Sequence, residues 1–310
     1  MAEPLEARLN DFFDALATYT FTPLTLLKFS KMLLGIDNPE ENAGFRPEKR
    51  DPKFVSFASR IFKKATQPYF RPEVHGLTNL PAKGAGLIVG NHNGGLVPVD
   101  TFIAGGAIAR YFGASRPVYG LAHDFLFRES TLSNILERMG ALKATYKSAE
   151  LAFEREGLVI VYPGGDIETF RPFKKRHKID FGNRTGFIRL ALQKQVPVYP
   201  CVSIGCHETF YVLTRGEKIA KIFGFKKKLR TTVFPIVLSF PWGLTSGFLP
   251  YIPLPSKIII EFLPALDWSK YGPEDADNPE VLQACSREII GIMQTRLNKM
   301  AAERNLPLVG

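Results

Sequence analysis

Cysteine is scarce in this chain of 310 residues, which contains only Cys201, Cys206 and Cys285. An odd number of cysteines cannot pair completely into disulfides, and the three form no zinc-binding spacing with the five scattered histidines. The first residues also lack the basic start and the cleavage site of a secretory signal. We therefore expect a protein of a reducing compartment, without a metal site.

Short motifs of several enzyme classes are absent as well. No serine occurs in a Gly-x-Ser-x-Gly context, and neither a phosphate loop nor a dinucleotide-binding fingerprint is present. These absences disfavour a covalent serine or cysteine mechanism. They leave direct attack by a hydroxyl group that another residue activates as a base.

Charge is missing from one long stretch, residues 231–256, which also contains no histidine. Its length would permit a membrane-spanning helix, but its several prolines argue against a single helix. We interpret it as an apolar loop that covers an acyl-chain tunnel or dips into lipid, with plain core packing as the alternative. The basic cluster Lys226–Arg230 directly precedes it, which is the combination that contact with an anionic leaflet would use, and an ordinary solvated charge run is the alternative.

Positive charge and phenylalanine are abundant. The formal net charge is +10, and 25 residues are phenylalanine. A basic surface favours anionic partners such as nucleic acid, anionic lipid or phosphorylated substrates. Because no recognition-helix, zinc-finger or aromatic RNA-binding pattern accompanies the charge, we expect an anionic membrane surface as partner and no nucleic acid.

Residues 5–34 are expected to be helical and strongly apolar, with a break at Pro23. Their charge-free part, Ala15 to Leu27, is too short to span a bilayer. It indicates a monotopic anchor lying in the membrane interface, or else a helical hairpin packed on the protein itself. A proline-punctuated linker follows, so we divide the chain into an N-terminal helical segment and linker, 1–51, and a main domain, 52–310.

The main domain alternates short apolar runs with helical patterns, which predicts an α/β fold with a central mixed, largely parallel sheet flanked by helices. The expected strands are Gly86–Val89, Val118–Ala122, Leu158–Tyr162, Val196–Ile204 and Lys257–Leu263. The expected helices are Thr101–Tyr111, Thr131–Met139, Ser148–Arg155, Asn183–Gln193 and Pro279–Arg304.

The most informative segment runs from Gly90 through Asn91-His92-Asn93 to Asp100, between an expected strand and an expected helix. A neutral imidazole can take a proton from a hydroxyl group near neutral pH, and a carboxylate can orient that imidazole. His92 and Asp100 are therefore candidates for a catalytic base and its partner. The alternative is an ordinary turn in which Asp100 caps the next helix.

A second histidine, His123, also precedes an aspartate, Asp124. Adjacent side chains in an extended segment point to opposite faces. This spacing predicts that His123 and Asp124 make a poor dyad, which leaves His92 as the best-placed base.

A second loop follows the expected strand at Leu158 and reads Tyr162-Pro163-Gly164-Gly165-Asp166-Ile167-Glu168. Glycines at the end of a strand let backbone amides approach a ligand closely. Basic residues come next, from Arg171 to Lys178, and could hold the phosphates of a donor such as coenzyme A. A tight turn followed by a solvated charged loop is the alternative.

Together and in this order, these blocks resemble the glycerolipid acyltransferase superfamily, which includes lysophosphatidic acid and glycerol-3-phosphate acyltransferases and, more distantly, diacylglycerol acyltransferases. The resemblance covers about residues 72–264. It rests on Asn91-His92 with Asp100, on Gly120–Phe127, on Tyr162–Glu168, on Val196–Pro200 and on a stretch similar to the family's Gly-Phe helix, Asn183–Ala191.

The spacing within the first block departs from the family pattern. The commonest family motif has four residues between histidine and aspartate, whereas seven separate His92 from Asp100. Gly94 and Gly95 lie in this gap and could absorb the extra length as a bulged loop.

The second loop departs as well. Many lysophosphatidic acid enzymes have an arginine after a Pro-Glu-Gly loop, where this chain has Ile167. That arginine is linked in the family with the acceptor phosphate, so its absence, together with Glu168, favours the neutral-lipid branch. Arg171 or Arg184 are the residues that could substitute for it.

The resemblance implies an O-acyltransferase that moves a fatty acyl group from acyl-CoA or acyl carrier protein to a hydroxyl of a glycerolipid or lysophospholipid. The reaction would take place at the cytoplasmic face of a membrane, without a cofactor. His92 would be the general base and Asp100 its orienting partner, and amides near Gly164 and Gly165 would stabilise the oxyanion. The expected substrate-binding residues are Asn91, Gly94, Gly95, Pro163, Gly164, Gly165, Glu168, Arg171 and Arg184.

Three other functions remain open on the sequence. A neutral-lipid (mono- or diacylglycerol) acyltransferase differs only in its acceptor. A catalytically silent lipid-binding protein on the same fold would explain the long spacing between His92 and Asp100. A lipid hydrolase is disfavoured by the missing serine nucleophile.

Overall fold

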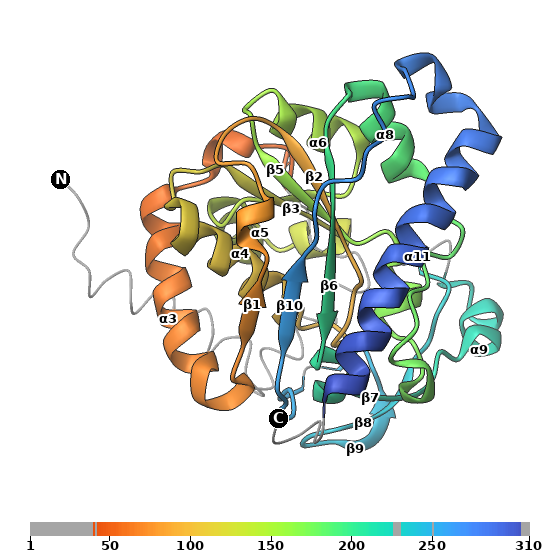
Figure 1. The fold of residues 1–310 in the computed structure, drawn as a ribbon. Helices are drawn as coiled ribbons and strands as arrows, with labels where there is room; N and C mark the ends of the chain where they lie inside the picture. The colour runs from red at the N-terminus through yellow and green to blue at the C-terminus, as the bar shows by residue number, and fades with distance from the viewer. Residues whose placement is uncertain (1–39, 41, 226–230, 250, 305–310) are drawn as a thin grey trace.

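A seven-stranded sheet forms the centre of the computed structural model, which describes residues 40, 42–225, 231–249 and 251–304 (Figure 1). The strand order is β1-β10-β6-β2-β5-β3-β4, and neighbouring strands run parallel except for the antiparallel pair β10 and β6. The strands are β1 (Glu73–His75), β2 (Gly86–Gly90), β3 (Val118–Ala122), β4 (Ala141–Lys143), β5 (Leu158–Val161), β6 (Val198–Ile204) and β10 (Ile259–Phe262). The expected mixed, largely parallel sheet is confirmed.

The strands expected from the sequence are all present, and their ends differ from the expected ones by at most two residues. Every residue of β2 and of β6 is buried, as is typical of parallel strands covered on both faces. Such strands appear in a sequence as continuous apolar runs, which explains why they could be predicted. The three-residue strands β1 and β4 are too short to carry a pattern.

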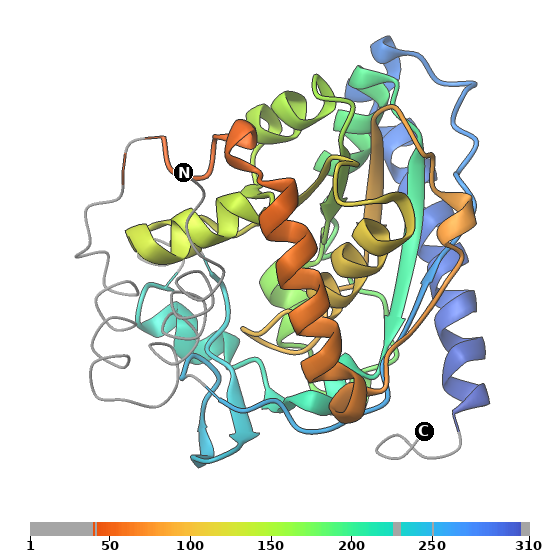
Figure 2. The same ribbon diagram turned by 90° about the vertical axis from the view of Figure 1, so that its left-hand side faces the viewer.

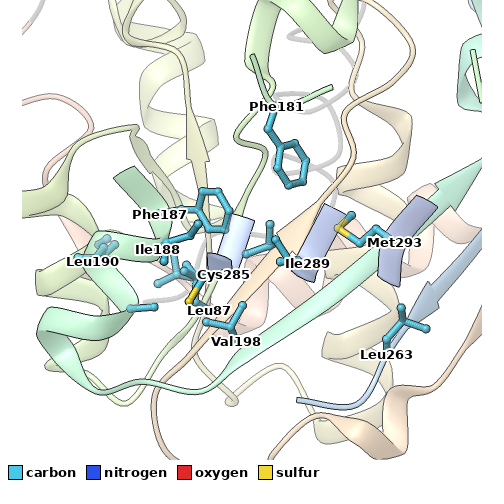
Figure 3. Packing of buried hydrophobic residues seen from close by; sticks show 14 of the residues in the cluster. Leu87, Phe181, Phe187, Ile188, Leu190, Val198, Leu263, Cys285, Ile289 and Met293 are labelled. Carbon is cyan, nitrogen blue, oxygen red and sulfur yellow. The ribbon is translucent and has the colours of Figure 1, made fainter. Parts of the chain in front are cut away.

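Helices cover both faces of the sheet (Figures 1 and 2). One face carries α6 (Tyr146–Phe153), α8 (Gly186–Lys194) and α11 (Pro279–Glu303), and the other carries α3 (Pro52–Phe70) and α4 (Val99–Phe112). Figure 3 shows part of the first core layer, where Cys285 and Ile289 of α11 lie close to the sheet residues Leu87 and Val198. The remaining expected helix is α5 (Ser130–Arg138), so flanking helices are confirmed as well.

The residues just before α3 belong to the packed part of the chain. Ala43 is buried, the N–H of Gly44 donates to Glu137 Oε1 at 2.7 Å, and Arg46 forms a salt bridge with the same carboxylate, which is fully buried. Asp51 then caps α3 by accepting hydrogen bonds from the N–H groups of residues 53 and 54. The segment expected to be a linker therefore packs against α5 through Gly44 and Arg46.

The expected helical segment at residues 5–34 lies outside the described residues. Within the described ranges, no helix combines the length and the apolar character that crossing a bilayer requires.

The charge-free stretch 231–256 was expected to be a loop, and this expectation is wrong in part. It contains β8 (Ile236–Ser239) and β9 (Gly243–Ser246), which form a small antiparallel sheet with β7 (Tyr211–Thr214). Two of its prolines, Pro235 and Pro241, fall just outside the strands, where a missing N–H costs no ladder hydrogen bond. The frequent prolines therefore made this stretch resemble a loop, and the two short strands were not predicted from the sequence.

Candidate active site

The two predicted loops meet at one edge of the large sheet. The His92 loop follows β2, the Pro163–Glu168 loop follows β5, and β6 ends beside them in the sheet order. Parallel strands bring their carboxyl ends to the same edge, which is where α/β proteins place their sites. A hydrogen bond joins the loops, because the backbone N–H of His92 donates to Glu168 Oε2 at 2.9 Å.

The His92 imidazole lies against the carboxylate of Asp100. The distance from His92 Nδ1 to Asp100 Oδ2 is 3.7 Å, with the aspartate side chain buried and the histidine side chain 19% exposed. Asp100 is held by the N–H of Asn93 at 3.2 Å on Oδ2 and by the N–H of Thr101 at 2.7 Å on Oδ1. The pair needs less than 1 Å of further approach to form a hydrogen bond, which is common for catalytic pairs without substrate.

Gly94 and Gly95 take up the extra residues between His92 and Asp100. Both have positive φ angles, +91° and +72°, which L side chains rarely adopt. At Gly95 a Cβ atom would also lie 2.6 Å from the hydroxyl of Tyr251. That hydroxyl donates to the carbonyl of Gly94 and accepts the N–H of Val97 at 3.1 Å. The expected bulged loop is therefore present, and the hydroxyl of Tyr251 holds it by these two hydrogen bonds.

Two buried asparagines fix the start of the loop. Asn91 exchanges hydrogen bonds with the backbone of Ser203 in β6, its Nδ2 donating at 2.9 Å and its Oδ1 accepting at 2.8 Å. Asn93 donates from Nδ2 to the hydroxyl of Ser203 at 2.9 Å. Asn91 was expected to bind substrate, and the structure places its side-chain amide in hydrogen bonds that join the end of β2 to β6.

Glu168 and Arg171 form a completely buried ion pair. Arg171 Nη1 lies 3.1 Å from Glu168 Oε1, and neither side chain is exposed. Glu168 also accepts the N–H of Asp180 at 3.1 Å, and Arg171 donates to Asn93 Oδ1 at 2.8 Å. Burial raises the pKa of Glu168, but the permanently charged guanidinium beside it opposes that shift. Both residues were expected to bind substrate, and in the structure their buried side chains connect the two loops through bonds to His92 and Asn93.

Arg184 supports the second loop from outside. It donates to the carbonyls of Pro163 and Gly164, both at 3.0 Å, and to Asp166 Oδ1 at 2.8 Å. Asp166 in turn accepts the hydroxyl of Thr231 at 2.8 Å. These bonds engage Arg184 in holding the loop, although 42% of its side chain remains exposed.

The glycines of the second loop have different surroundings. Gly164 is buried, and a Cβ atom there would lie 2.5 Å from Glu168 Oε2, so only glycine lets the carboxylate reach His92. Gly165 is partly exposed, and its N–H donates to the carbonyl of Tyr162 at 3.0 Å. Among the expected substrate-binding residues, Gly165 and Arg184 are the two that keep access to solvent.

Tyr162 is a site residue that the sequence reasoning missed. Its ring stacks on the His92 imidazole with 4.4 Å between centroids and an angle of 20° between the planes. Burial and the nearby Asp100 raise the pKa of Tyr162, so the phenol stays neutral beside the imidazole. Its position directly before Pro-Gly-Gly was the available signal. Asn93, Ser203 and Tyr251 were missed as well, because their partners are distant in sequence.

His123 and Asp124 do meet, which corrects the expectation that they point apart. His123 Nδ1 lies 2.8 Å from Asp124 Oδ1. The reason is local: Asp124 begins a 3-10 helix, Asp124–Phe127, so the pair does not lie in one extended strand. The pair is far more exposed than that of His92 and Asp100.

The three cysteines are buried and free. Burial raises the pKa of the Cys201 and Cys206 thiols and raises the pKa of Cys285 to about 11. Protonated thiols are poor nucleophiles, so the described structure offers no activated cysteine. The part of the chain that the structure describes also contains no cluster of three residues able to hold a metal ion.

Comparisons with known proteins identify a family model and relatives that match this chain. A family model described as "Acyltransferase" matches residues 71–204, which include both loops. An uncharacterized protein of Mycobacterium tuberculosis is 31% identical over 258 residues, which cover 83% of this chain and 69% of that protein. A second relative, from Bos taurus, is named "DGAT1/2-independent enzyme synthesizing storage lipids" and is 27% identical over 191 residues, which cover 62% of this chain and 55% of the relative.

A solved structure shares the fold. The crystal structure of the 1-acyl-sn-glycerophosphate (LPA) acyltransferase PlsC from Thermotoga maritima matches with a TM-score of 0.52 and 14% sequence identity. The match covers 97% of this chain and 98% of that structure. This likeness shows the fold. The family model and the Mycobacterium tuberculosis relative at 31% identity together show that this chain belongs to the acyltransferase family.

Proposed function

We propose that this protein is an O-acyltransferase that transfers a fatty acyl group from an acyl thioester to a lipid hydroxyl. The observation that carries the proposal is the buried Asp100 carboxylate facing His92 Nδ1 at 3.7 Å, at the edge where β2 and β5 end. Both residues lie in the segment that follows β2, within the range that the family model matches, and this supports a base with its orienting group.

The proposed reaction uses the second ring nitrogen of His92. Nδ1 faces Asp100, so Nε2 is the atom that accepts the proton of the acceptor hydroxyl. The hydroxyl oxygen attacks the thioester carbonyl carbon and forms a tetrahedral oxyanion. The carbon–sulfur bond then breaks, and the leaving thiolate takes the proton back from the imidazolium. Asp100 stabilises the imidazolium between these two steps.

The oxyanion needs hydrogen-bond donors close to His92. The N–H of Gly165 is already bonded to the carbonyl of Tyr162, so the backbone N–H of Gly164 is the better candidate. Gly164 lies next to the Glu168 carboxylate that holds the backbone of His92. The loop can therefore present this amide at a fixed position relative to the base.

We infer that the acceptor is a neutral glycerolipid rather than a phosphorylated one. Arg171 is buried in an ion pair, and Arg184 is bonded to two loop carbonyls and to Asp166, so both expected phosphate ligands have other partners. The Bos taurus relative is named for the synthesis of storage lipids, which supports the same choice. Because the acceptor is a lipid and the net charge is +10, we place the reaction at the cytoplasmic face of a membrane.

The test is acyl transfer by the purified full chain from labelled acyl-CoA or acyl carrier protein to a panel of acceptors. The panel holds monoacylglycerol, diacylglycerol, lysophosphatidic acid and glycerol 3-phosphate. We expect acylated neutral lipid, and loss of activity by about 10²–10⁴ in His92→Ala. His75→Ala is the control and should keep full activity, because His75 lies on β1 with 55% of its side chain exposed.

Each of the other outcomes would indicate a different function for this protein. No product with any acceptor would favour a silent lipid-binding protein, and free fatty acid without acylated lipid would favour a hydrolase. Arg184→Met separates the acceptors. If Arg184 only supports the loop, this variant lowers turnover on neutral and phosphorylated acceptors alike, whereas a selective rise of KM for phosphorylated acceptors would show phosphate contact.

A further inference from the structure

Exposed apolar side chains are concentrated on one part of the surface. Of the thirteen large apolar side chains that are exposed among the described residues, nine lie between residues 211 and 254. They belong to the small sheet, to α9 (Glu217–Ile222) and to the turns beside them. We call this surface the β7–β9 patch; it consists of Leu213, Ile222, Phe223, Leu238, Phe240, Trp242, Leu244, Ile252 and Leu254.

The strand register shows why the patch is apolar. Leu238 pairs with Tyr211 on one side and with Leu244 on the other, so these three side chains share the outer face. Leu238 is 52% exposed and Leu244 is 69% exposed. The outer face of a small antiparallel sheet is ordinarily polar. Here it carries leucines instead, and an apolar surface of this kind normally binds something.

The inner face of the same sheet packs against the His92 loop. Val212 pairs with Val237, and both are buried in a cluster that also contains Phe210 and Tyr251. This cluster packs on Val97 of the His92 loop, and the Tyr251 hydroxyl bonds to the same loop. The β7–β9 patch and the loop of the candidate base therefore lie on opposite sides of one thin layer.

The edge of the patch is basic. α9 contributes the exposed residues Lys218 and Lys221, next to Ile222 and Phe223, which are 79% and 61% exposed. This helix has one acidic residue, Glu217, which lies 3.6 Å from Arg215, while Arg215 also pairs with Asp180 at 2.8 Å. Residues 231–249 and 251–256 of the patch region carry no charge at all.

This combination points to a membrane rather than a protein groove or a peptide. Trp242 and Phe240 are residue types that favour the membrane interface, and lysines at the edge can reach anionic headgroups while their stems stay apolar. Two cavities of the described structure, of about 490 and 110 Å³, lie against α3 and α4. None of the nine exposed side chains of the patch lines either of these cavities.

We propose that the β7–β9 patch is the surface with which the protein docks on an anionic phospholipid leaflet. In Figure 1 the small sheet of β7, β8 and β9 lies at the lower end of the molecule, where β6 also ends. Docking there would bring the edge of the large sheet that carries His92 close to the lipid. Docking on the leaflet rests on the proposed function in that it would bring a lipid acceptor to the proposed site of acyl transfer. Binding to lipid can nevertheless be measured without measuring turnover.

Trp242 offers a direct test, because the chain has only two tryptophans and the other, Trp268, is 7% exposed in the core. The full chain is mixed with vesicles of phosphatidylcholine and phosphatidylglycerol whose acyl chains carry bromine, a fluorescence quencher. We expect a blue shift and quenching of tryptophan emission on vesicle binding, and loss of both in Trp242→Phe. His92→Ala should behave like the wild type, which separates this proposal from the proposed function.

A second variant tests the contribution of the leucines. Leu238→Asn with Leu244→Asn should weaken binding to these vesicles about tenfold or more, because both side chains lose apolar contact with lipid. Ile292→Asn on α11, 39% exposed, is the matched control and should bind like the wild type. Circular dichroism and melting identify a variant that fails to fold, in which case the Trp242 measurement decides.

Two outcomes would overturn the proposal. The protein could float with the vesicles while Trp242 emission stays unquenched, which would place the lipid contact elsewhere in the chain. Alternatively, the vesicles could fail to bind the protein while Leu238→Asn with Leu244→Asn dissociates a dimer, which would make the patch a contact between two copies.

Discussion

His92 Nδ1 lies 3.7 Å from Asp100 Oδ2, and the shared loop closes this pair although seven residues separate the two in sequence. The carboxylate is already fixed by the N–H groups of Asn93 and Thr101. Its position is therefore preorganised, and the imidazole is the part that must move to complete the hydrogen bond.

Replacing the aspartate tests this relationship. Asp100→Asn keeps an oxygen for the N–H of Thr101 but removes the charge that faces Nδ1. We expect kcat to fall by about 10²–10⁴ with KM little changed, because the imidazolium loses its stabilising partner. Steady-state kinetics with the preferred acceptor measure this. Asp124→Asn is the control, since the pair of Asp124 with His123 should not contribute, and full activity of Asp100→Asn would show that His92 acts alone.

The glycine at position 95 should be irreplaceable. In Gly95→Ala the new Cβ would lie 2.5 Å from the Phe210 ring and 2.6 Å from the Tyr251 hydroxyl, in addition to its strained φ of +72°. We expect a loss of stability of about 2–4 kcal/mol and a large loss of activity. Gly84→Ala is a matched control, because Gly84 has a φ of +85° and open space around it. Equal melting temperatures for the two variants would mean that crowding at Gly95 is relieved cheaply.

Removing one partner of the buried pair of Glu168 and Arg171 should destabilise the fold far more than removing one partner of a surface ion pair. Glu168→Gln leaves the guanidinium buried without its counter-charge, which should cost about 3–5 kcal/mol of unfolding free energy. Glu150→Gln removes an exposed partner, 2.9 Å from Lys194, and should cost at most about 1 kcal/mol. Urea unfolding of both variants gives the comparison. Similar values for the two would contradict a bracing role for Glu168.

Stability should fall in mild acid because of His207. Burial, with a smaller contribution from Arg171, lowers the pKa of His207 to about 3. The folded protein therefore keeps this ring neutral, while the unfolded chain takes up a proton near the ordinary value of 6.5. The neutral His207 ring therefore makes its whole contribution to the free energy of unfolding above about pH 6.5. This contribution decreases as the pH falls toward 3, by about 3 kcal/mol at pH 4.

The measurement is urea unfolding of the wild type and of His207→Gln between pH 7 and pH 4. Glutamine can still donate to the carbonyl of Arg171, which His207 Nε2 contacts at 2.6 Å, but it does not titrate. The variant should therefore lose less stability than the wild type over this range. Parallel curves for the two proteins would show that His207 is not the group responsible.

Much of the architecture was predictable because it is local. The strands around Leu87, Val159 and Val202 are buried on both faces and form continuous apolar runs. The small sheet was not predictable, since β8 and β9 have four residues each between prolines. The contact of His123 with Asp124 was misjudged because a single 3-10 turn changes which way neighbouring side chains point.

The amino-acid sequence alone determined the α/β plan, the two loops with His92 and Gly164, and the resemblance to acyltransferases, because these depend on local apolar patterns and on the order of short motifs. Only the tertiary structure decided the roles of individual polar residues. Whether Arg171 binds a phosphate or a buried carboxylate depends on Glu168, Asn93 and the burial around them. Charge and burial are properties of the assembled fold, which no local pattern specifies.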